Sequence, residues 1–290
     1  MPEPQPEPAS ADVEHGSTGR QRLGLLFWAS VGWLGLIATL AATADWLPLP
    51  DPTRPGVAPA RQPPTLHHLL GADVLGRDML SRTIHGARVS LVVGFSSIAF
   101  GLLVGGAVGV LAGYFRGRFE AIAMGTVDVL LAFPALVFAL ALVSFLGPSL
   151  GTVTLAIGVL SIAPIARIIR ASTLAFAQRE FVLAARTVGA RHRRIIVSEI
   201  LPNVIPAAVS FALVAVAVAI VSEGALAFLG LSVAAPTPAW GSMINEGRTV
   251  LQDAPHISFV PSAAMFLTVL ALNFAGDSLR VRFDVGEGRL

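Results

Sequence analysis

The sequence predicts an all-α membrane protein of about six transmembrane helices, and both its composition and the length of its apolar blocks support this fold class. Of the 290 residues, 54% are hydrophobic and only 13% are charged, whereas a soluble domain of this size needs far more polar surface. A helix needs about 20 apolar residues to cross a bilayer. Five blocks of at least that length contain no Asp, Glu, Lys or Arg: 23–44, 89–115, 129–166, 200–222 and 254–276.

The block at 129–166 is nearly twice the length of one span, and Gly147-Pro148-Ser149 interrupts it near its middle. Glycine and proline favour turns, so we expect two helices joined by a tight turn, and six spans in total. Pro134 lies inside the first of these two helices. Because proline lacks an N–H group and its ring clashes with the preceding turn, we expect a kink there.

Two missing residue types narrow the possible functions. The chain contains no cysteine, which excludes disulfides, thiolate metal sites and thiol nucleophiles. It also contains no lysine; all 20 of its basic residues are arginine. A P-loop lysine, a kinase-type lysine and a Schiff-base lysine are therefore excluded. Any ATP that drives this protein must therefore bind to another chain.

Other kinds of chemistry lack support as well. The histidines show no metal-ligand spacing, and no side chains form a convincing nucleophile–base pair. We therefore expect no catalytic residue, no metal and no cofactor in this chain. The net charge of +2 is small and gives no reason to expect a nucleic-acid partner.

The first 22 residues are expected to form a disordered cytoplasmic tail, since residues 1–19 are rich in Pro, Glu, Ser and Ala. Ala42-Thr43-Ala44 resembles a signal-peptide cleavage site. The apolar block before it is too long for a typical signal peptide, however, and five more spans follow, so we favour an uncleaved helix. We expect four regions in the chain: the tail at 1–22, a first helix and external loop at 23–88, a transmembrane core at 89–280 and a cytoplasmic tail at 281–290.

The arginines predict the orientation, because loops on the cytoplasmic side carry an excess of them. Four segments, which we place inside, together hold 13 of the 20 arginines: 1–22, 114–122, 168–202 and 280–290. Three segments are placed outside, where acids match the arginines in number: 45–88, 147–151 and 230–256. Both termini are therefore expected on the cytoplasmic side of a membrane that the chain would cross several times.

Within the spans, small and charged side chains stand out. Gly101, Gly105, Gly109 and Gly113 recur every four residues and so share one helix face, where another backbone can approach closely. That approach would serve either a contact with a second subunit or packing within one bundle. The charged tract 73–82 is expected to form an interfacial or external helix, which would contact an external protein or lipid headgroups.

The cytoplasmic segment 179–202 reads REFVLAARTVGARHRRIIVSEILP. Phe181, Ala184, Ala185 and Val188 have the spacing of one apolar face on a short helix, which Gly189 would end in a left-handed turn. A second short helix is expected to begin at the arginines 191, 193 and 194 and to end near Pro202. Such a segment could lie on anionic lipid or fit a groove in another protein.

This segment resembles the EAA loop of binding-protein-dependent ABC importer permeases. Five residues match that motif in register: Ala184, Ala185, Gly189, Leu201 and Pro202. Leu183 replaces the Glu of the motif, and Glu199 replaces an Ile. Three further segments are similar to the C-type subunit of dipeptide and oligopeptide (nickel) permeases: 69–94, 221–248 and 266–284.

The resemblance implies the type I ABC importer permease fold and a permease subunit that forms half of the pathway for peptides or related small solutes. It implies four kinds of partner besides the lipid bilayer: a second permease of B type, two ATP-binding subunits that hold ATP and Mg²⁺, and an external substrate-binding protein. ATPase activity would belong to those subunits, so this chain would not be an enzyme. An ion-gradient-driven secondary transporter is the alternative, although the sequence shows no convincing internal repeat.

The resemblance also implies roles for particular residues. Contact with the ATPase is expected from nine of them: Leu183, Ala184, Ala185, Arg186, Gly189, Arg191, Arg193, Leu201 and Pro202. Three acids are candidates for reasons apart from the resemblance, because ionisable groups inside a membrane are costly. Glu223, near the outer end of the fifth span, would either line or gate the pathway or be a hydrogen-bonded structural acid. Asp128 and Asp277 would either act in gating or pair with Arg167, Arg170 or Arg280. The cargo stays open among dipeptides, oligopeptides, nickel chelates and other small solutes.

Overall fold

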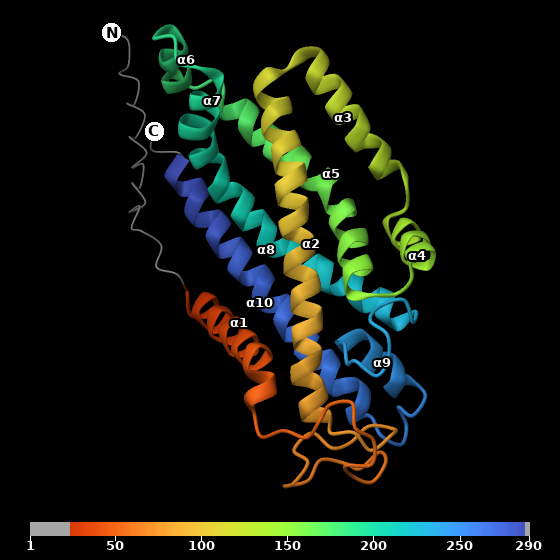
Figure 1. Ribbon diagram of the computed structural model, residues 1–290. Helices are drawn as coiled ribbons and strands as arrows, with labels where there is room; N and C mark the ends of the chain where they lie inside the picture. The colour runs from red at the N-terminus through yellow and green to blue at the C-terminus, as the bar shows by residue number, and fades with distance from the viewer. Residues whose placement is uncertain (1–23, 288–290) are drawn as a thin grey trace, which may run out of the picture.

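The computed structural model describes residues 24–287, which form a long bundle of helices with an irregular segment at one end (Figure 1). The helices in chain order are α1 (Leu25–Thr43), α2 (Met79–Phe115), α3 (Gly117–Ala132), α4 (Ala135–Leu146), α5 (Leu150–Phe176), α6 (Glu180–Thr187), α7 (His192–Arg194), α8 (Leu201–Phe228), α9 (Trp240–Arg248) and α10 (His256–Glu287). A short 3₁₀ helix, Ala44–Trp46, follows α1, and a π-helical stretch, Ile195–Ile200, precedes α8. The predicted tail at 1–22 lies outside the described residues. Most of the predicted C-terminal tail belongs to α10.

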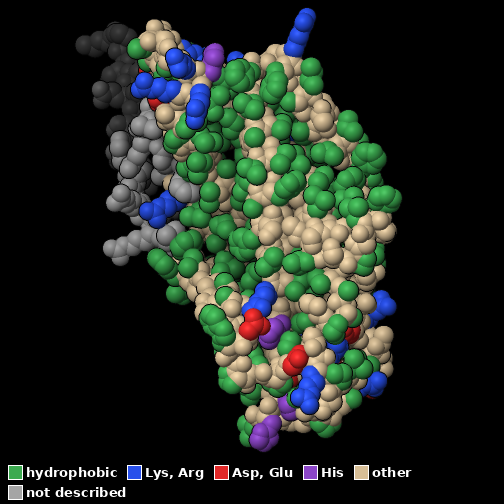
Figure 2. Space-filling view, in the orientation of Figure 1, with side chains coloured by type: hydrophobic (Ala, Val, Ile, Leu, Met, Phe, Trp, Pro, Cys, Tyr) green, Lys and Arg blue, Asp and Glu red, His purple; other side chains and the backbone are tan. Residues whose placement is uncertain are grey.

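Five helical stretches within the described residues are long and apolar enough to cross a membrane, and α3 with α4 makes a sixth if this bent pair is counted as one span. The prediction of about six spans is therefore confirmed. Hydrophobic side chains cover the middle of the face in Figure 2, while arginines gather near α6 and α7, and charges of both signs gather at the opposite end. This distribution suits a protein whose middle lies in lipid.

The third predicted span differs from expectation in its shape. Instead of kinking at Pro134, the helix ends at Ala132, and α4 leaves at an angle of 83° to α3. Phe133 and Pro134 have ψ angles of 136° and 119°, outside the helical range, because a residue before proline avoids the helical conformation. The predicted turn at 147–149 is present, with Gly147 at a φ of +88°.

Helix α2 lies at the centre of the bundle and packs mainly on α5 and α8. Its four spaced glycines all face α5. A Cβ atom on Gly105 would lie 2.5 Å from the carbonyl oxygen of Ile162, and one on Gly109 would lie 2.6 Å from that of Ala166. The close backbone approach is thus used within this chain, between α2 and α5.

The charged tract at 73–82 is not a separate helix, so that expectation was wrong. Asp73 Oδ1 accepts hydrogen bonds from the backbone N–H groups of Leu75 and Arg77, which holds a turn in place of a helix. Asp78 then caps α2 by accepting a hydrogen bond from the N–H group of Ser81 at 2.8 Å. Helix α2 therefore begins at Met79.

The second short helix predicted in the 179–202 segment does not end near Pro202, which is a further correction. The chain stays helical from His192 to Phe228, through the π-helical stretch and into α8. Pro202 lies directly after the π-helical stretch, at the second residue of α8, and the helix continues through it. The 179–202 segment therefore consists of one short helix, a turn and the beginning of a long membrane helix.

Candidate functional site

Helix α6 and the turn after it form a projection at one end of the bundle (Figure 1). Glu180 in the first turn and Arg186 in the last turn both suit the helix dipole. Gly189 has a φ of +79°, and its N–H group donates to the carbonyl oxygen of Arg186 at 3.0 Å. Glycine adopts this left-handed conformation without strain, so the predicted turn is well matched to its residue.

The projection is held to the bundle by few side chains. Val182 is fully buried and Ala185 half-buried against the core, whereas the rest of the predicted apolar face points outward. Val188 is 87% exposed, Leu183 is 48% exposed and Phe181 is 40% exposed. We call the exposed group Phe181, Leu183, Ala184, Val188 and Gly189 the coupling surface.

Cations surround this coupling surface. Four exposed arginines lie on α6, the turn and α7: Arg186, Arg191, Arg193 and Arg194. Of the other residues predicted to contact an ATPase, Pro202 is exposed and Leu201 is half-buried at the start of α8. An exposed apolar surface with a charged rim is typical of a protein-binding site.

A contact that the sequence reasoning missed joins this projection to α2. The hydroxyl of Tyr114 lies 2.8 Å from Nδ1 of His192, and the guanidinium carbon of Arg186 lies 5.0 Å from the centre of the Tyr114 ring. Tyr114 is buried and is the only tyrosine in the chain. Its position directly before the predicted inner loop was the available signal, but nothing in the spacing linked it to residues about 75 positions later.

The comparisons with known proteins decide the family. The family model described as "binding-protein-dependent transport system inner membrane component" matches residues 105–286, which include the projection. This chain belongs to that family. The permease is 40% identical over 221 residues to the glutathione transport system permease protein GsiD of Pectobacterium atrosepticum, covering 76% of this chain and 73% of that one. Its identity to the GsiD protein of Escherichia coli O1:K1 is 41% over the same shares.

Solved structures agree on the fold. The permease matches a chain of the inward-facing MetNI methionine ABC transporter with a TM-score of 0.61 at 19% identity, covering 70% of this chain and 97% of that one. It matches a chain of an amino acid ABC transporter with a TM-score of 0.52 at 19% identity, covering 73% and 95%. The permease thus has the type I importer fold, and the comparisons do not favour a secondary transporter. It is a multi-pass inner-membrane subunit of a binding-protein-dependent importer, in the dipeptide and oligopeptide family.

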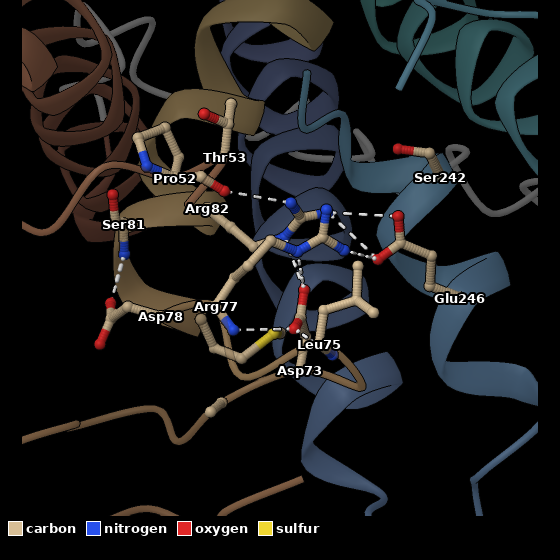
Figure 3. Close-up of polar contacts among 12 residues, drawn as sticks. Pro52, Thr53, Asp73, Leu75, Arg77, Asp78, Ser81, Arg82, Ser242 and Glu246 are labelled. Carbon is tan, nitrogen blue, oxygen red and sulfur yellow. Dashed lines mark hydrogen bonds and ion pairs between the residues drawn. The ribbon is translucent and has the colours of Figure 1, made fainter. Parts of the chain in front are cut away.

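At the end of the permease opposite the coupling surface, four charged side chains form a cluster that joins the 47–78 segment, α2 and α9 (Figure 3). Arg77 donates to Asp73 at 2.5 Å and to Glu246 at 2.8 Å. Arg82, only 1% exposed, donates to Glu246 at 3.1 Å and to the carbonyl oxygen of Pro52 at 3.2 Å. The sequence indicated the tract 73–82 but did not connect Glu246 to it.

The predicted pathway acids lie in three different settings. Glu223 is fully buried and accepts hydrogen bonds from the hydroxyls of Ser90 at 2.9 Å and Ser232 at 2.7 Å. Asp128 pairs with Arg167 at 2.6 Å. Asp277 is exposed on α10.

Two further expectations concern Arg170 and a possible metal site. Arg170, the second predicted partner of Asp128, pairs with Glu120 instead. Within the described range, no group of His, Asp and Glu side chains has the arrangement of a metal site.

An apolar cavity of about 440 Å³ lies between α2, α4, α5 and α8. Among its lining residues only Ser161 and Ser222 are polar, and neither Glu223 nor Asp128 lines it. The wall is formed by side chains such as Leu136, Leu160 and Phe211. This cavity is the candidate for the permease's side of the pathway.

Proposed function

We propose that this permease forms half of a translocation pathway and has no chemistry of its own. Its partners would be a second permease of B type, an external substrate-binding protein and two subunits that hold ATP and Mg²⁺ and carry out the hydrolysis. The proposal gains support from family membership and from the absence of lysine, because a P-loop needs that residue. The apolar cavity would be this chain's contribution to the pathway.

The coupling surface is the single observation that carries the proposal. Its apolar side chains protrude on a short helix that is held to the core by Val182, Ala185 and the contact of Arg186 with Tyr114. Exposed side chains such as Val188 and Leu183 gain free energy by entering a groove of another protein. We propose that this groove belongs to an ATP-binding subunit, whose closure on ATP would pull α6 and tilt the bundle.

Leu183 changes the chemistry of that contact. It stands where the motif has Glu, and it is half exposed next to Phe181. The contact would therefore be apolar at this position, and the exposed arginines on the rim would supply the charged part. A groove that fits this permease should offer apolar side chains with acidic residues around them.

The orientation follows from the same proposal. The end of α10 lies toward α6 and α7 in Figure 1, and the exposed arginines lie there too. We propose that this end faces the cytoplasm together with both termini, and that the 47–78 segment and α9 face outward. The binding protein would then deliver its cargo at the outer end.

The cargo is proposed to be a peptide or a peptide-like small solute. The relatives named above are glutathione permeases, and glutathione is a modified tripeptide with several charges. Glu223 lies outside the cavity lining, and its two hydroxyl partners connect α8 with α2 and with the segment before α9. We propose that Glu223 acts in gating by holding the outer end of α8, without touching the cargo. The ion pair of Asp128 with Arg167 would hold α3 against α5 in the same way, and Asp277 would face the pathway's inner mouth.

Two glycine variants test the proposal. Gly189→Pro would distort the coupling surface, and we expect ATP hydrolysis by the complex to continue while import is lost. The control is Gly117→Pro, because Gly117 also has a positive φ, of +62°, and open space around it, yet it lies off the coupling surface. Import by the Gly189 variant at the level of the control would show that α6 does not carry the coupling.

A further inference from the structure

The two arms of the coupling projection meet on one side chain of α2. Arg186 comes from α6, His192 begins α7, and the left-handed Gly189 lies between them. Both side chains contact Tyr114, the first by its guanidinium over the ring and the second by a 2.8 Å hydrogen bond. The ring of Phe115 adds a contact with His192 at 5.7 Å between ring centres.

The backbone joins the projection to helices other than α2, which the side chains of Arg186 and His192 contact. Through the backbone, α6 continues from α5, and α7 continues into α8. Helix α2 has no backbone link to either arm, so its inner end is joined to them by the side chains of Tyr114 and Phe115. A displacement of the projection would pull α5 and α8 directly. Helix α2 would follow through its glycine face on α5, and Tyr114 and Phe115 give its inner end a direct contact with the projection as well.

Helix α2 is also the element best placed to carry a displacement outward. It runs without interruption for 37 residues, or roughly 55 Å at about 1.5 Å per residue. Its glycine face is seated on α5, and at its outer end Arg82 is bound to Glu246 of α9. A movement of its inner end would therefore reach the cluster of Arg82 and Glu246 at its other end.

We propose that Tyr114 is a positioning residue that couples α2 to the projection, so that α2 moves together with α6 and α7 during transport. This inference rests on the proposed role of the coupling surface as the ATPase contact. It assigns to Tyr114, His192 and Arg186 a function inside the permease. Tyr114 itself is buried and lies off the coupling surface, so it does not contact the ATPase.

Two substitutions at this position separate coupling from packing. Tyr114→Phe keeps the ring under Arg186 and removes the hydroxyl contact, while Tyr114→Leu removes both. With the whole importer in liposomes, we expect the amount of cargo imported per ATP hydrolysed to fall about threefold for Phe and about tenfold for Leu. Phe119→Leu is the matched control, because that aromatic lies at the same end and contacts Phe115 but not the projection.

A chemical rescue distinguishes this role from a structural one. The chain has no native cysteine, so a Tyr114→Cys/His192→Cys pair provides its only two thiols. Linking them with a short bifunctional thiol reagent should restore import per ATP, whereas the unlinked pair should stay uncoupled. A packing role would show reduced folded yield and no gain on linking, which would overturn the proposal.

Co-purification keeps the two proposals apart. Tyr114→Leu should still bring down the ATP-binding subunits, because the coupling surface is unchanged. If the Tyr114→Leu variant binds those subunits and also imports normally, the proposed coupling through Tyr114 is wrong and the ATPase contact stands. If the wild-type permease holds those subunits after the coupling surface is removed by Leu183→Asp and Val188→Asp, the ATPase contact itself is wrong, and this inference falls with it.

Discussion

The guanidinium of Arg82 lies 3.1 Å from Oε2 of Glu246, although 164 residues separate them in the chain. This contact connects the first turn of α2 with α9, and Arg77 and Asp73 complete a cluster of two positive and two negative charges. Buried charges need partners, because removing one partner leaves the others uncompensated. The ion pairs therefore join the start of α2, the segment before it and α9 at this end of the bundle.

Removing one charge from this cluster should destabilise the permease. We expect Glu246→Ala to cost on the order of 3 kcal/mol, because two nearly buried arginines would then share only Asp73. The measurement is the thermal unfolding of purified protein in detergent. Asp253→Ala is the control, since its ion pair with Arg61 is exposed and 3.8 Å long, and it should shift the midpoint little. Equal shifts for both variants would contradict a stabilising cluster.

Because α2 and α5 are in close contact, we expect Gly105 not to tolerate a larger side chain. Gly105→Leu should reduce folded yield strongly, because even its Cβ atom would lie 2.5 Å from the backbone of Ile162. Gly125→Leu, in α3, should be tolerated, as no atom lies within 4 Å of a Cβ placed there. Yield is measured by size-exclusion chromatography of a fluorescent fusion. A well-folded Gly105 variant would show that the two helices have room to separate.

Glu223 should tolerate the loss of its charge better than the loss of its hydrogen bonds. Glu223→Gln keeps an oxygen and a nitrogen facing Ser90 and Ser232, so we expect near-normal yield and import. Glu223→Leu leaves two buried hydroxyls without their partner and should cost about 1–3 kcal/mol. Transport and folded yield are measured side by side. Normal yield with no import in the Gln variant would instead place the carboxylate in the pathway.

Cysteine labelling should report the orientation cleanly, because the chain has no native thiol. A membrane-impermeant maleimide applied to intact spheroplasts should label Leu66→Cys, a 94% exposed position in the segment that we propose to be external, but not Arg118→Cys. Inside-out vesicles should give the reverse result. Val188→Cys should react in such vesicles only when the ATP-binding subunits are absent, and equal reaction in their presence would contradict the proposed contact.

The sequence predicted those parts of the fold that depend on local chemistry. Charge-free blocks marked the spans, Gly147 marked the turn between α4 and α5, and Gly189 marked the end of α6. Each of these follows from the solvent or from backbone conformation at one position. The motif around Ala184 and Ala185 likewise indicated the projection.

Features that depend on distant residues were missed. Helix α2 starts at Met79 after a turn held by Asp73, whose partners Arg77 and Arg82 are themselves bound to the distant Glu246. Tyr114 gains its importance only when the fold brings Arg186 and His192 to it. The helix continues past Pro202 because the π-helical stretch before it belongs to a long membrane helix, which local propensity does not reveal.

The wall of the cavity between α4, α5 and α8 has a consequence for how cargo would travel. Hydrocarbon with two hydroxyl groups gives the ionised ends of a peptide nothing to bind. Such a wall therefore does not retain a charged solute, because ionised groups lose their hydration there without gaining a partner. Selection among solutes would then depend on the protein that first captures the cargo outside the membrane. Exchanging that protein should change which solutes are imported without any change in this chain.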